Sequence, residues 1–143
     1  MTKYGSASIK VEFDLATADT LQDMTAYCTE LNGFSIKGQI DETTCFGDTY
    51  VKRAYSGFKE VDTITIGGYY DDTATTGPEA VFNDVGCAAT VHSSGLRTLK
   101  ITWGSTKTSS VPCIIESYSR RPDLKGLTRF EVTLQPAGVV TEV

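Results

Sequence analysis

The sequence is short of the residues and motifs on which catalysis and metal binding usually depend. Its 143 residues include a single histidine, His92, and four cysteines with no C-x-x-C pair among them. It has no P-loop, no G-x-G-x-x-G fingerprint, no H-E-x-x-H and no G-x-S-x-G elbow. A histidine-based triad would have to use His92, which precedes the turn-like segment Ser93-Ser94-Gly95. We therefore expect a protein that is not an enzyme and that holds no cofactor or metal ion.

Long apolar runs and an excess of positive charge are also missing. No run of about 18 apolar residues is present, and Met1–Lys10 contains no apolar signal-peptide core, so we expect synthesis in a cytoplasm. The chain has 13 basic and 18 acidic residues, a net charge of −5, which argues against binding nucleic acid by neutralising its phosphates. Residues 1–72 carry 12 acids and 6 bases and residues 73–143 carry 6 and 7, so the charge is uneven. An ordinary solvated surface explains this, and complementary faces in a self-assembly are the alternative.

The few residues that could bind a metal ion have simple structural interpretations. The cysteines Cys28, Cys45, Cys87 and Cys113 are separated by 17, 42 and 26 residues, and we expect four small buried hydrophobes. Cys113 supports this expectation because it lies in the apolar run Val111–Ile115. The acidic pair Asp71-Asp72 lies in a Thr/Gly-rich loop, where a calcium site or a solvent-facing role is only a low-specificity hypothesis.

The composition favours strands. Thr (21), Val (11) and Ile (8) together supply 40 β-branched residues, against 18 Leu and Ala. Branched side chains fit a pleated sheet and lose rotamer freedom in a helix. Alternating or continuously apolar segments predict strands at Ser8–Phe13, Met24–Leu31, Phe34–Asp41, Val61–Tyr70, Thr98–Trp103, Val111–Tyr118 and Arg129–Gln135.

Turn and cap signals complete the predicted fold. Asn32-Gly33 predicts a tight hairpin between Met24–Leu31 and Phe34–Asp41, because both residues accept positive φ. Pro78 predicts the start of one short helix over Glu79–Val85, with Gly86 as its terminator and Ala80, Val81 and Val85 buried. We therefore expect one domain over residues 1–143, a β-sandwich or barrel of about seven strands with one short α-helix.

The segment Glu42–Lys59 has no clear periodicity and carries the aromatic residues Phe46, Tyr50, Tyr55 and Phe58. Long loops are uncommon and are usually functional, and a solvated loop gains nothing from holding exposed rings. We expect an arm that packs on a neighbouring subunit, with an extended assembly loop at residues 46–59. A flap folded onto its own domain is the alternative.

Several predicted strands have a fully polar second face. Solvent explains such a face in a monomer. In a closed ring it would line a wet channel, whose acidic and hydroxyl groups would let DNA pass without binding it. Pairing between subunits would also remove the free strand edges that a sandwich must otherwise protect.

Four segments carry recognisable motifs in a fixed order: Asp41–Thr49, Tyr55–Glu60, Thr63–Asp71 and Phe130–Gly138. They include a Thr-Thr-x-x-Gly-Asp stretch, a Gly-Phe-Lys-Glu turn leading into an Ile/Thr strand, and a closing Leu-Gln-Pro-Ala-Gly. In these segments the chain resembles the major tail tube proteins of long-tailed, siphovirus-like bacteriophages. Cys45 departs from the family pattern, in which a polar residue is more usual.

The resemblance implies a structural virion protein that assembles into hexameric rings, which stack into a tail tube for DNA ejection. The implied partners are further copies of the chain, a tape-measure protein, a tail terminator and baseplate proteins, with DNA passing through and no membrane involved. It also implies a location in the virion tail after assembly in the host cytoplasm.

Residues that lie in the segments resembling the tail tube family are the candidate contact residues. Those between subunits or rings are Phe46, Gly47, Asp48, Tyr50, Gly57 and Phe58. The polar face of the predicted hairpin makes Lys37, Gln39 and Asp41 the candidate lumen residues. The alternatives are a capsid decoration or head–tail connector protein, and a carbohydrate-binding module with Tyr69, Tyr70 and Trp103 as an aromatic platform, although Trp103 is in phase with the core.

Overall fold

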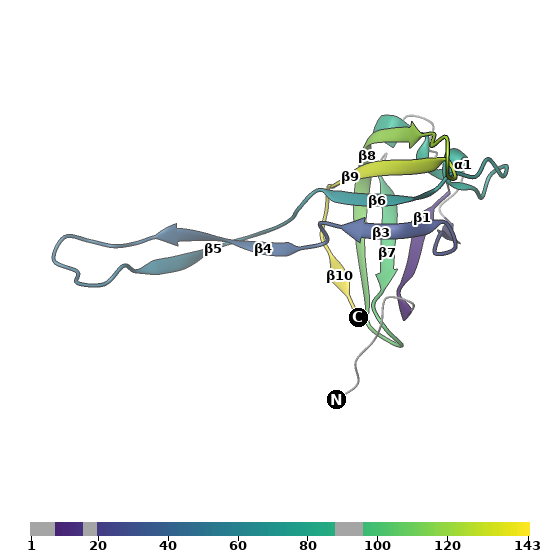
Figure 1. Cartoon of the computed structure of the whole chain (residues 1–143). Coiled ribbons are helices and arrows are strands. Elements are labelled where there is room, and N and C mark those ends of the chain that lie inside the picture. The colour runs from purple at the N-terminus through teal and green to yellow at the C-terminus, as the bar shows by residue number, and fades with distance from the viewer. Residues whose placement is uncertain (1–7, 16–19, 88–95) are drawn as a thin grey trace.

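The computed structural model describes residues 8–15, 20–87 and 96–143, and strands dominate this part of the chain (Figure 1). One short helix, α1 (Pro78–Phe82), and a 3₁₀ turn, η2 (Val85–Cys87), lie between β6 and β7. His92 and the expected turn Ser93-Ser94-Gly95 fall outside the described residues. The strands are β1 (Lys10–Asp14), β2 (Leu21–Asp23), β3 (Cys28–Asn32), β4 (Ile36–Glu42), β5 (Arg53–Val61), β6 (Ile64–Tyr69), β7 (Arg97–Thr102), β8 (Thr108–Arg121), β9 (Arg129–Pro136) and β10 (Thr141–Glu142).

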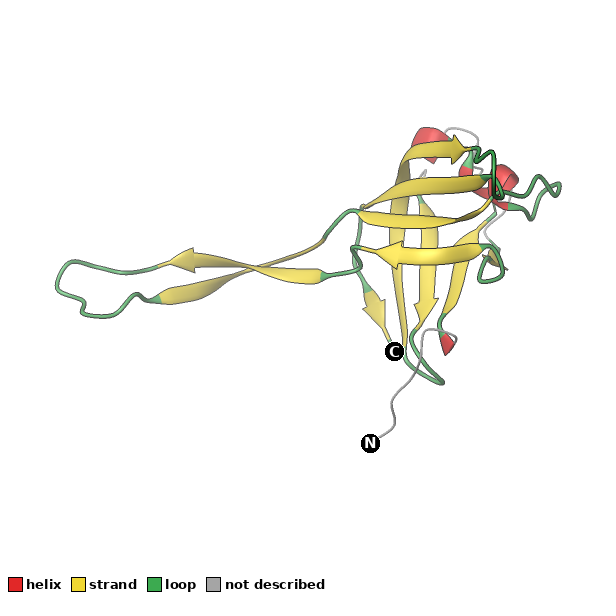
Figure 2. Ribbon diagram, in the orientation of Figure 1, coloured by secondary structure: helices red, strands yellow, loops and turns green. Residues whose placement is uncertain are grey.

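Eight of these strands form one antiparallel sheet in the order β2-β1-β7-β8-β9-β6-β3, with β10 also paired to β8. The sheet folds over at β8, which pairs with β7 as far as Cys113 and from Cys113 onward with β9, with a register shift between Ile115 and Ser117. The second part of β8 forms a front layer with β9, β6 and β3, and the other strands form a back layer. Figure 2 shows the front strands crossing the back ones. The predicted β-sandwich or barrel class is therefore confirmed.

The hydrophobic core fills the space between the layers. The alternation predicted for the last long strand is confirmed, because Phe130, Val132 and Leu134 are buried while Glu131 is exposed. Helix α1 covers one side of this core, where the Phe82 ring stacks on Phe130 with centroids 5.5 Å apart. The fully or nearly fully buried apolar residues are Val11, Phe13, Met24, Ile64, Ile66, Val81, Phe82, Leu99, Ile101, Val111, Cys113, Ile115, Phe130, Val132 and Leu134.

A buried arginine, which the sequence analysis did not single out, ties three segments together. Arg97 on β7 is 0% exposed, and its guanidinium lies 4.7 Å from the centre of the Phe13 ring. Its Nη2–H donates to the carbonyl oxygen of Asp14 at 2.5 Å, and its Nη1 lies 3.5 Å from an oxygen of Asp84. A charge this deep needs such partners because desolvation is costly. The contacts fix β7 and β1 to the segment that follows α1.

The expected Asn32-Gly33 hairpin is wrong. β3 pairs with β6 and β4 pairs with β5, so these two residues join a sheet strand to a projecting ribbon. Gly33 has a φ of +90°, and a Cβ there would lie 2.1 Å from the carbonyl oxygen of Thr63. Glycine is therefore required for close passage past the opposite strand rather than for a two-residue turn.

The helix boundaries also differ from the prediction. α1 ends at Phe82 with Asn83 as its C-cap, and Gly86 lies in η2 with a φ of +75°. Its buried residues are Pro78, Val81 and Phe82, whereas Val85 is 52% exposed. The helix is shorter because Phe82, which the predicted apolar stripe left out, is the residue that reaches the core.

Several predicted boundaries and one burial expectation need correction. The strand predicted at Met24–Leu31 begins only at Cys28, Leu21–Asp23 forms a separate strand before it, and β8 extends past the predicted end at Tyr118 to Arg121. Cys113 is buried and Cys28 half-buried, but Cys45 is exposed, so the expectation of buried cysteines is wrong for Cys45. Burial raises the pKa of the Cys28 thiol to about 12, and the charge of Asp23 adds to the effect.

Replacing Asp84 by alanine should destabilise the fold, because it removes the carboxylate beside the buried Arg97 guanidinium. Breaking a buried ion pair on one side costs about 3 kcal/mol or more. We expect Asp84→Ala to lower the free energy of unfolding by about 3 kcal/mol in urea denaturation. The exposed Asp72→Ala is the matched control, and equal unfolding midpoints for the two variants would contradict the role given to the Arg97 contacts.

Candidate assembly surfaces

The strands β4 and β5 form an arm that projects from the body (Figure 1). The arm continues the β3–β6 ladder without a change of register. Asn32 is opposite Thr65, and Ile36 is opposite Val61, so four steps along one strand match four steps back along the other. The Asp62 N–H donates to the carbonyl of Ser35 at 3.2 Å within this interval. The segments β3–β4 and β5–β6 thus form one long hairpin, and the arm is its outer part. Because the arm projects from the body, the alternative of a flap folded onto its own domain does not hold.

The expected loop at residues 46–59 is partly strand. The turn at the arm tip spans residues 43–52, and β5 begins at Arg53. A bulge interrupts β5 where residues 56–58 lie opposite the single residue Gln39. Gly57 has a φ of +96° there, and the Ser56 hydroxyl donates to the Gln39 carbonyl at 3.0 Å. Bulged strands give no clean period-two pattern, which explains why the sequence predicted a loop.

The arm has one apolar and one polar face. Ladder partners point to the same side, which brings the apolar pairs Ile36–Val61 and Ile40–Tyr55 to one face. The outer pair is largely exposed, with Ile40 61% and Tyr55 52% exposed, whereas Val61 at the root is half-buried against the core. Lys37 lies on the other face, 3.0 Å from a carboxylate oxygen of Asp62. A two-stranded ribbon is marginally stable by itself, so an uncovered apolar face indicates a surface that a partner covers.

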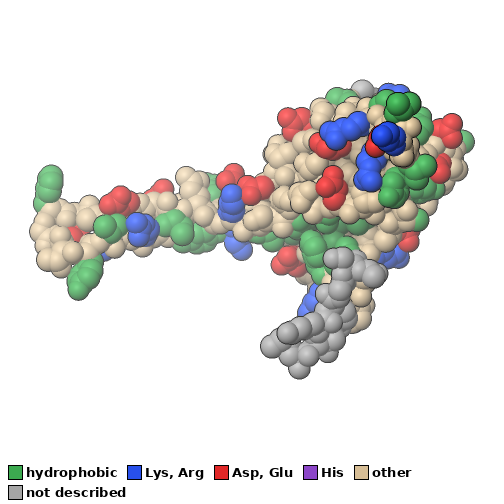
Figure 3. All heavy atoms as spheres, viewed as in Figure 1, with side chains coloured by type: hydrophobic (Ala, Val, Ile, Leu, Met, Phe, Trp, Pro, Cys, Tyr) green, Lys and Arg blue, Asp and Glu red, His purple; other side chains and the backbone are tan. Residues whose placement is uncertain are grey.

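The tip of the arm holds two aromatic side chains outward. Phe46 is 109% and Tyr50 83% exposed relative to a reference chain, and Figure 3 shows apolar side chains standing out at the far end. The turn beneath them is organised by Asp48, whose Oδ2 accepts from the Cys45 N–H at 2.7 Å. Its Oδ1 lies 3.0 Å from the Lys52 ammonium. The backbone hydrogen bond from Cys45, and then Lys52, lower the pKa of Asp48.

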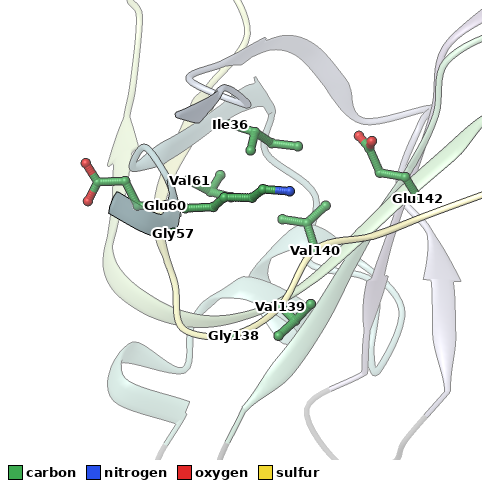
Figure 4. Close-up of a pocket in the computed structure, with 9 residues that line it drawn as sticks. Ile36, Gly57, Glu60, Val61, Gly138, Val139, Val140 and Glu142 are labelled. Atoms are coloured by element: carbon green, nitrogen blue, oxygen red, sulfur yellow. The ribbon is translucent and has the colours of Figure 1, made fainter. Parts of the chain in front are cut away.

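A groove lies at the root of the arm, between β4–β5 and the C-terminal segment (Figure 4). Its volume is about 560 Å³. Ile36, Val61, Val139 and Val140 line it with apolar groups, and Lys59, Glu60 and Glu142 add charged ones. Val139 is 83% exposed. Phe34 fixes the root to the body, where its ring meets Trp103 edge-on at 5.5 Å.

The front layer has open edges on both sides within the described part of the chain. β3 is an edge strand of the sheet, and the part of β8 from Ser117 to Arg121 pairs with β9 alone. A groove of about 350 Å³ follows the outer side of β3, lined by Ile9, Val11, Leu31 and Trp103 among others. An edge strand beside an apolar groove is a ready site for adding another strand.

The outer face of the front layer is a polar grid, as the mixed charges on this side of the body in Figure 3 show. The cross-strand pairs place its residues in rows. One row has Arg121, Arg129 and Tyr69; the next has Ser119, Glu131, Gly67 and Glu30; the third has Ser117, Thr133, Thr65 and Asn32. The polar faces of single strands are visible in the sequence, but the rows of the grid form only when four strands distant in the chain lie side by side.

The inner side of β8 is held by a polar cluster. The Tyr118 hydroxyl donates to Glu79 of α1 at 2.8 Å, and the Arg120 guanidinium lies 3.4 Å from the same carboxylate. Partial burial raises the pKa of Tyr118, and the Glu79 hydrogen bond adds to this. Arg120 is therefore engaged within its own chain, whereas Arg121 points to the grid.

The structure brings the predicted contact residues together on the arm. Phe46, Gly47, Asp48 and Tyr50 lie at the tip, and Gly57 and Phe58 in the bulge of β5. The predicted lumen residues Lys37, Gln39 and Asp41 lie on β4, so they belong to the arm rather than to the body. Their contacts and their relation to a channel remain predictions.

The features that suggested a ligand site do not form one. Tyr69 lies at the end of β6 farthest from the arm, whereas Trp103 packs at the arm root, so no aromatic platform unites them. Asp71 accepts from the Thr73 N–H at 2.7 Å in a local turn. Among the described residues, no group of three or more His, Cys, Asp or Glu side chains is placed to hold a metal ion.

Comparison with known proteins finds similarity in structure alone. No family model matches the sequence. No curated protein matches it either. Among solved structures, a chain from the tail of an empty gene transfer agent particle, refined with C6 symmetry, matches with a TM-score of 0.73 and 14% identity, covering 99% of both chains. A chain of the six-fold symmetrised anti-feeding prophage baseplate matches at 0.72 and 10%, covering 100% of this chain and 97% of that one.

A chain of the native gene transfer agent virion matches at 0.70 and 13% identity, with 99% of both chains covered. These matches are chains of a particle tail, a baseplate and a virion. The chain therefore has a tail-tube-like fold, as the resemblance in sequence led us to expect. No helix in the part of the chain that the structure describes is long and apolar enough to cross a membrane.

Loss of the Asp48 carboxylate should loosen the tip turn. Because its pKa is lowered in the folded chain, the stabilisation is present above the ordinary value of 3.8 and is lost as pH falls through the lowered pKa. We expect Asp48→Asn to speed amide hydrogen exchange at Cys45 at neutral pH, measured by NMR. Asp41→Asn, also on the arm, is the control. Unchanged exchange at Cys45 would show that Asp48 does not order the turn.

Proposed function

We propose that this chain is the repeating subunit of a phage-like tail tube, in which six copies close a ring and the rings stack. The observation that carries the proposal is the combination of an open-edged front layer with an arm whose apolar face is uncovered. Such features are aggregation hazards in a monomer and become contacts in a closed assembly. The C6 symmetry of a structurally similar tail supports the number of subunits.

Ring closure uses the two open edges of the front layer. Each neighbouring pair in the order β8-β9-β6-β3 is antiparallel, so β3 runs opposite to β8. The β8 of a second copy, placed beside β3, therefore continues the antiparallel pattern from one subunit to the next. Main-chain hydrogen bonds then satisfy both edges, and the rotation between copies closes the ring.

Stacking uses the arm. Its tip carries Phe46 and Tyr50 away from the body, and its apolar face carries Ile40 and Tyr55. Burying two rings of roughly 150 Å² each, at about 25 cal/mol per Å², gives several kcal/mol per contact before ordering costs. The groove at the arm root is an apolar hollow that can receive such a ring from another copy. The arm gains its full order in the stack, which restrains assembly of isolated subunits.

The polar grid of the front layer is our first candidate for the channel wall. Closing the ring through the edges of this layer makes one of its faces continuous around the channel. The grid is rich in hydroxyl and mixed charged groups, and the whole chain carries −5, which suits a wall that DNA passes without lasting binding. Lys37, Gln39 and Asp41 are the second candidate, which requires the polar face of the arm to turn inward.

The remaining partners follow from the family resemblance. A tape-measure protein would fill the channel until DNA ejection, and terminator and baseplate proteins would cap the two ends of the tube. The location would be the tail of a virion, after assembly in the host cytoplasm. Matches to chains from virion tails support this location.

Electron microscopy of the concentrated, purified protein tests the proposal, and we expect hexameric rings or tubes. Phe46→Ala, Tyr50→Ala and Phe58→Ala should leave a folded protein, with an unchanged circular dichroism spectrum, that forms few or no tubes. Leu124→Ala is the matched control, since Leu124 is 100% exposed in the β8–β9 turn, away from the arm. Discrete trimers would instead favour a capsid decoration protein, and a stable monomer that binds a glycan array would favour a carbohydrate-binding module.

A further inference from the structure

Two arginines face each other at one end of the polar grid. Arg121 on β8 is directly opposite Arg129 on β9. Like charges in directly opposed positions destabilise a sheet unless other groups compensate. Arg129 is partly accommodated, because its guanidinium stacks on the Tyr69 ring at 5.0 Å. None of the ion pairs found among the described residues involves Arg121 or Arg129.

An acidic residue occupies the opposite edge of the same face. Glu30 lies on β3, opposite Gly67, and its Oε1 would be 2.4 Å from a Cβ on that glycine. The side chain therefore lies back over its own sheet in the single chain. Glu131 on β9 shares this row, which therefore contains two carboxylates in line with Ser119.

Glu30 and Arg121 form no ion pair with each other among the described residues, although both border the same small hollow of about 60 Å³. They stand on the two outer strands of the front layer, which are separated by three strand spacings, or about 14 Å. Both are exposed. Complementary charges on opposite edges of one surface suit a head-to-tail contact between identical copies, in which each copy supplies one charge to each neighbour.

We propose that Arg121 of one subunit pairs with Glu30 of the adjacent copy, and that this pair limits the register of the β8–β3 junction between subunits to shifts by an even number of residues. The proposal rests on the ring closure proposed above. If the rows of the grid run straight across the junction, Glu30 lies opposite Ser119 and diagonal to Arg121 of the neighbour, within reach of an arginine side chain. A shift of two residues places the two directly opposite each other. A shift of one residue would put them on different faces, so the pair excludes it.

The pair also resolves the crowding of positive charge in each subunit. The carboxylate of the neighbouring copy would compensate the Arg121–Arg129 pair, since none of the ion pairs among the described residues involves either arginine. Because the grid is solvated, this contact is weakened by salt. Ring formation should accordingly need more protein as the salt concentration rises.

Charge reversal with rescue tests the proposal. We expect Arg121→Glu and Glu30→Arg, each by itself, to raise the protein concentration needed for ring or tube formation by about tenfold or more, because like charges then meet at the junction. The double variant, which restores opposite charges, should assemble near the concentration of the unmodified protein. Light scattering measures the concentration, and electron microscopy identifies the product.

The control is Lys125→Glu, which makes the same charge change in the β8–β9 turn, outside the rows of the grid. It should assemble normally. Circular dichroism and thermal unfolding confirm that each variant is folded, and Arg121→Ser and Glu30→Gln provide milder versions if a reversal prevents folding. If the unmodified protein forms rings and either single reversal also assembles normally, the pairing is wrong. The tail-tube function is then not contradicted. A double variant that fails to assemble although it is folded would overturn it as well. Absence of rings from the unmodified protein would overturn both proposals.

Discussion

The main constraint on this structure is that the N–H and C=O groups along two strand edges have no partner strand among the described residues of one copy. The front layer exposes β3 at one side and the second part of β8 at the other, and within the described residues neither has a strand beyond it. The arm adds a two-stranded ribbon whose apolar face has no cover. A soluble monomer usually blunts such edges with charge, bulges or short strands. Here the unpaired edges are antiparallel to each other and lie on opposite sides of one layer, which is the arrangement that identical copies can complete.

The body serves to hold these surfaces in fixed positions. The bend in β8 turns one sheet into two layers, so the edges of the front layer are separated from those of the back layer. The buried Arg97 and the Tyr118–Glu79 hydrogen bond anchor the surroundings of α1 to both layers. The root of the arm is anchored to the body because it continues the β3–β6 ladder in register and because the Phe34 ring contacts Trp103. Its direction is therefore set by the sheet rather than by a flexible loop.

Much of the fold could be predicted from period-two patterns, which identified the strands later seen as β1, β7 and β9 and the β class. Such patterns give no information on which strands pair, so Asn32-Gly33 was interpreted as a local hairpin although Gly33 instead allows a close approach to Thr63. Arg97 is in phase with Leu99 and Ile101, a signal of burial that its charge concealed. The aromatic residues of the arm were identified correctly as exposed, since they lack periodicity. The polar grid could not be found in the sequence, because its rows combine residues from strands far apart in the chain.

The central claim is that β3 and the arm become protected only in contact with other copies. Hydrogen–deuterium exchange of the same protein, kept dilute as single subunits and concentrated as an assembly, measures this most directly. The account predicts that the outward-facing amides of β3 and of the second part of β8, together with the amides of the arm tip, exchange rapidly in single subunits and slowly in the assembly. Amides of β7 should be protected equally in both. Equal exchange at β3 and the arm at every concentration would contradict the claim, because it would show that no other copy covers these segments.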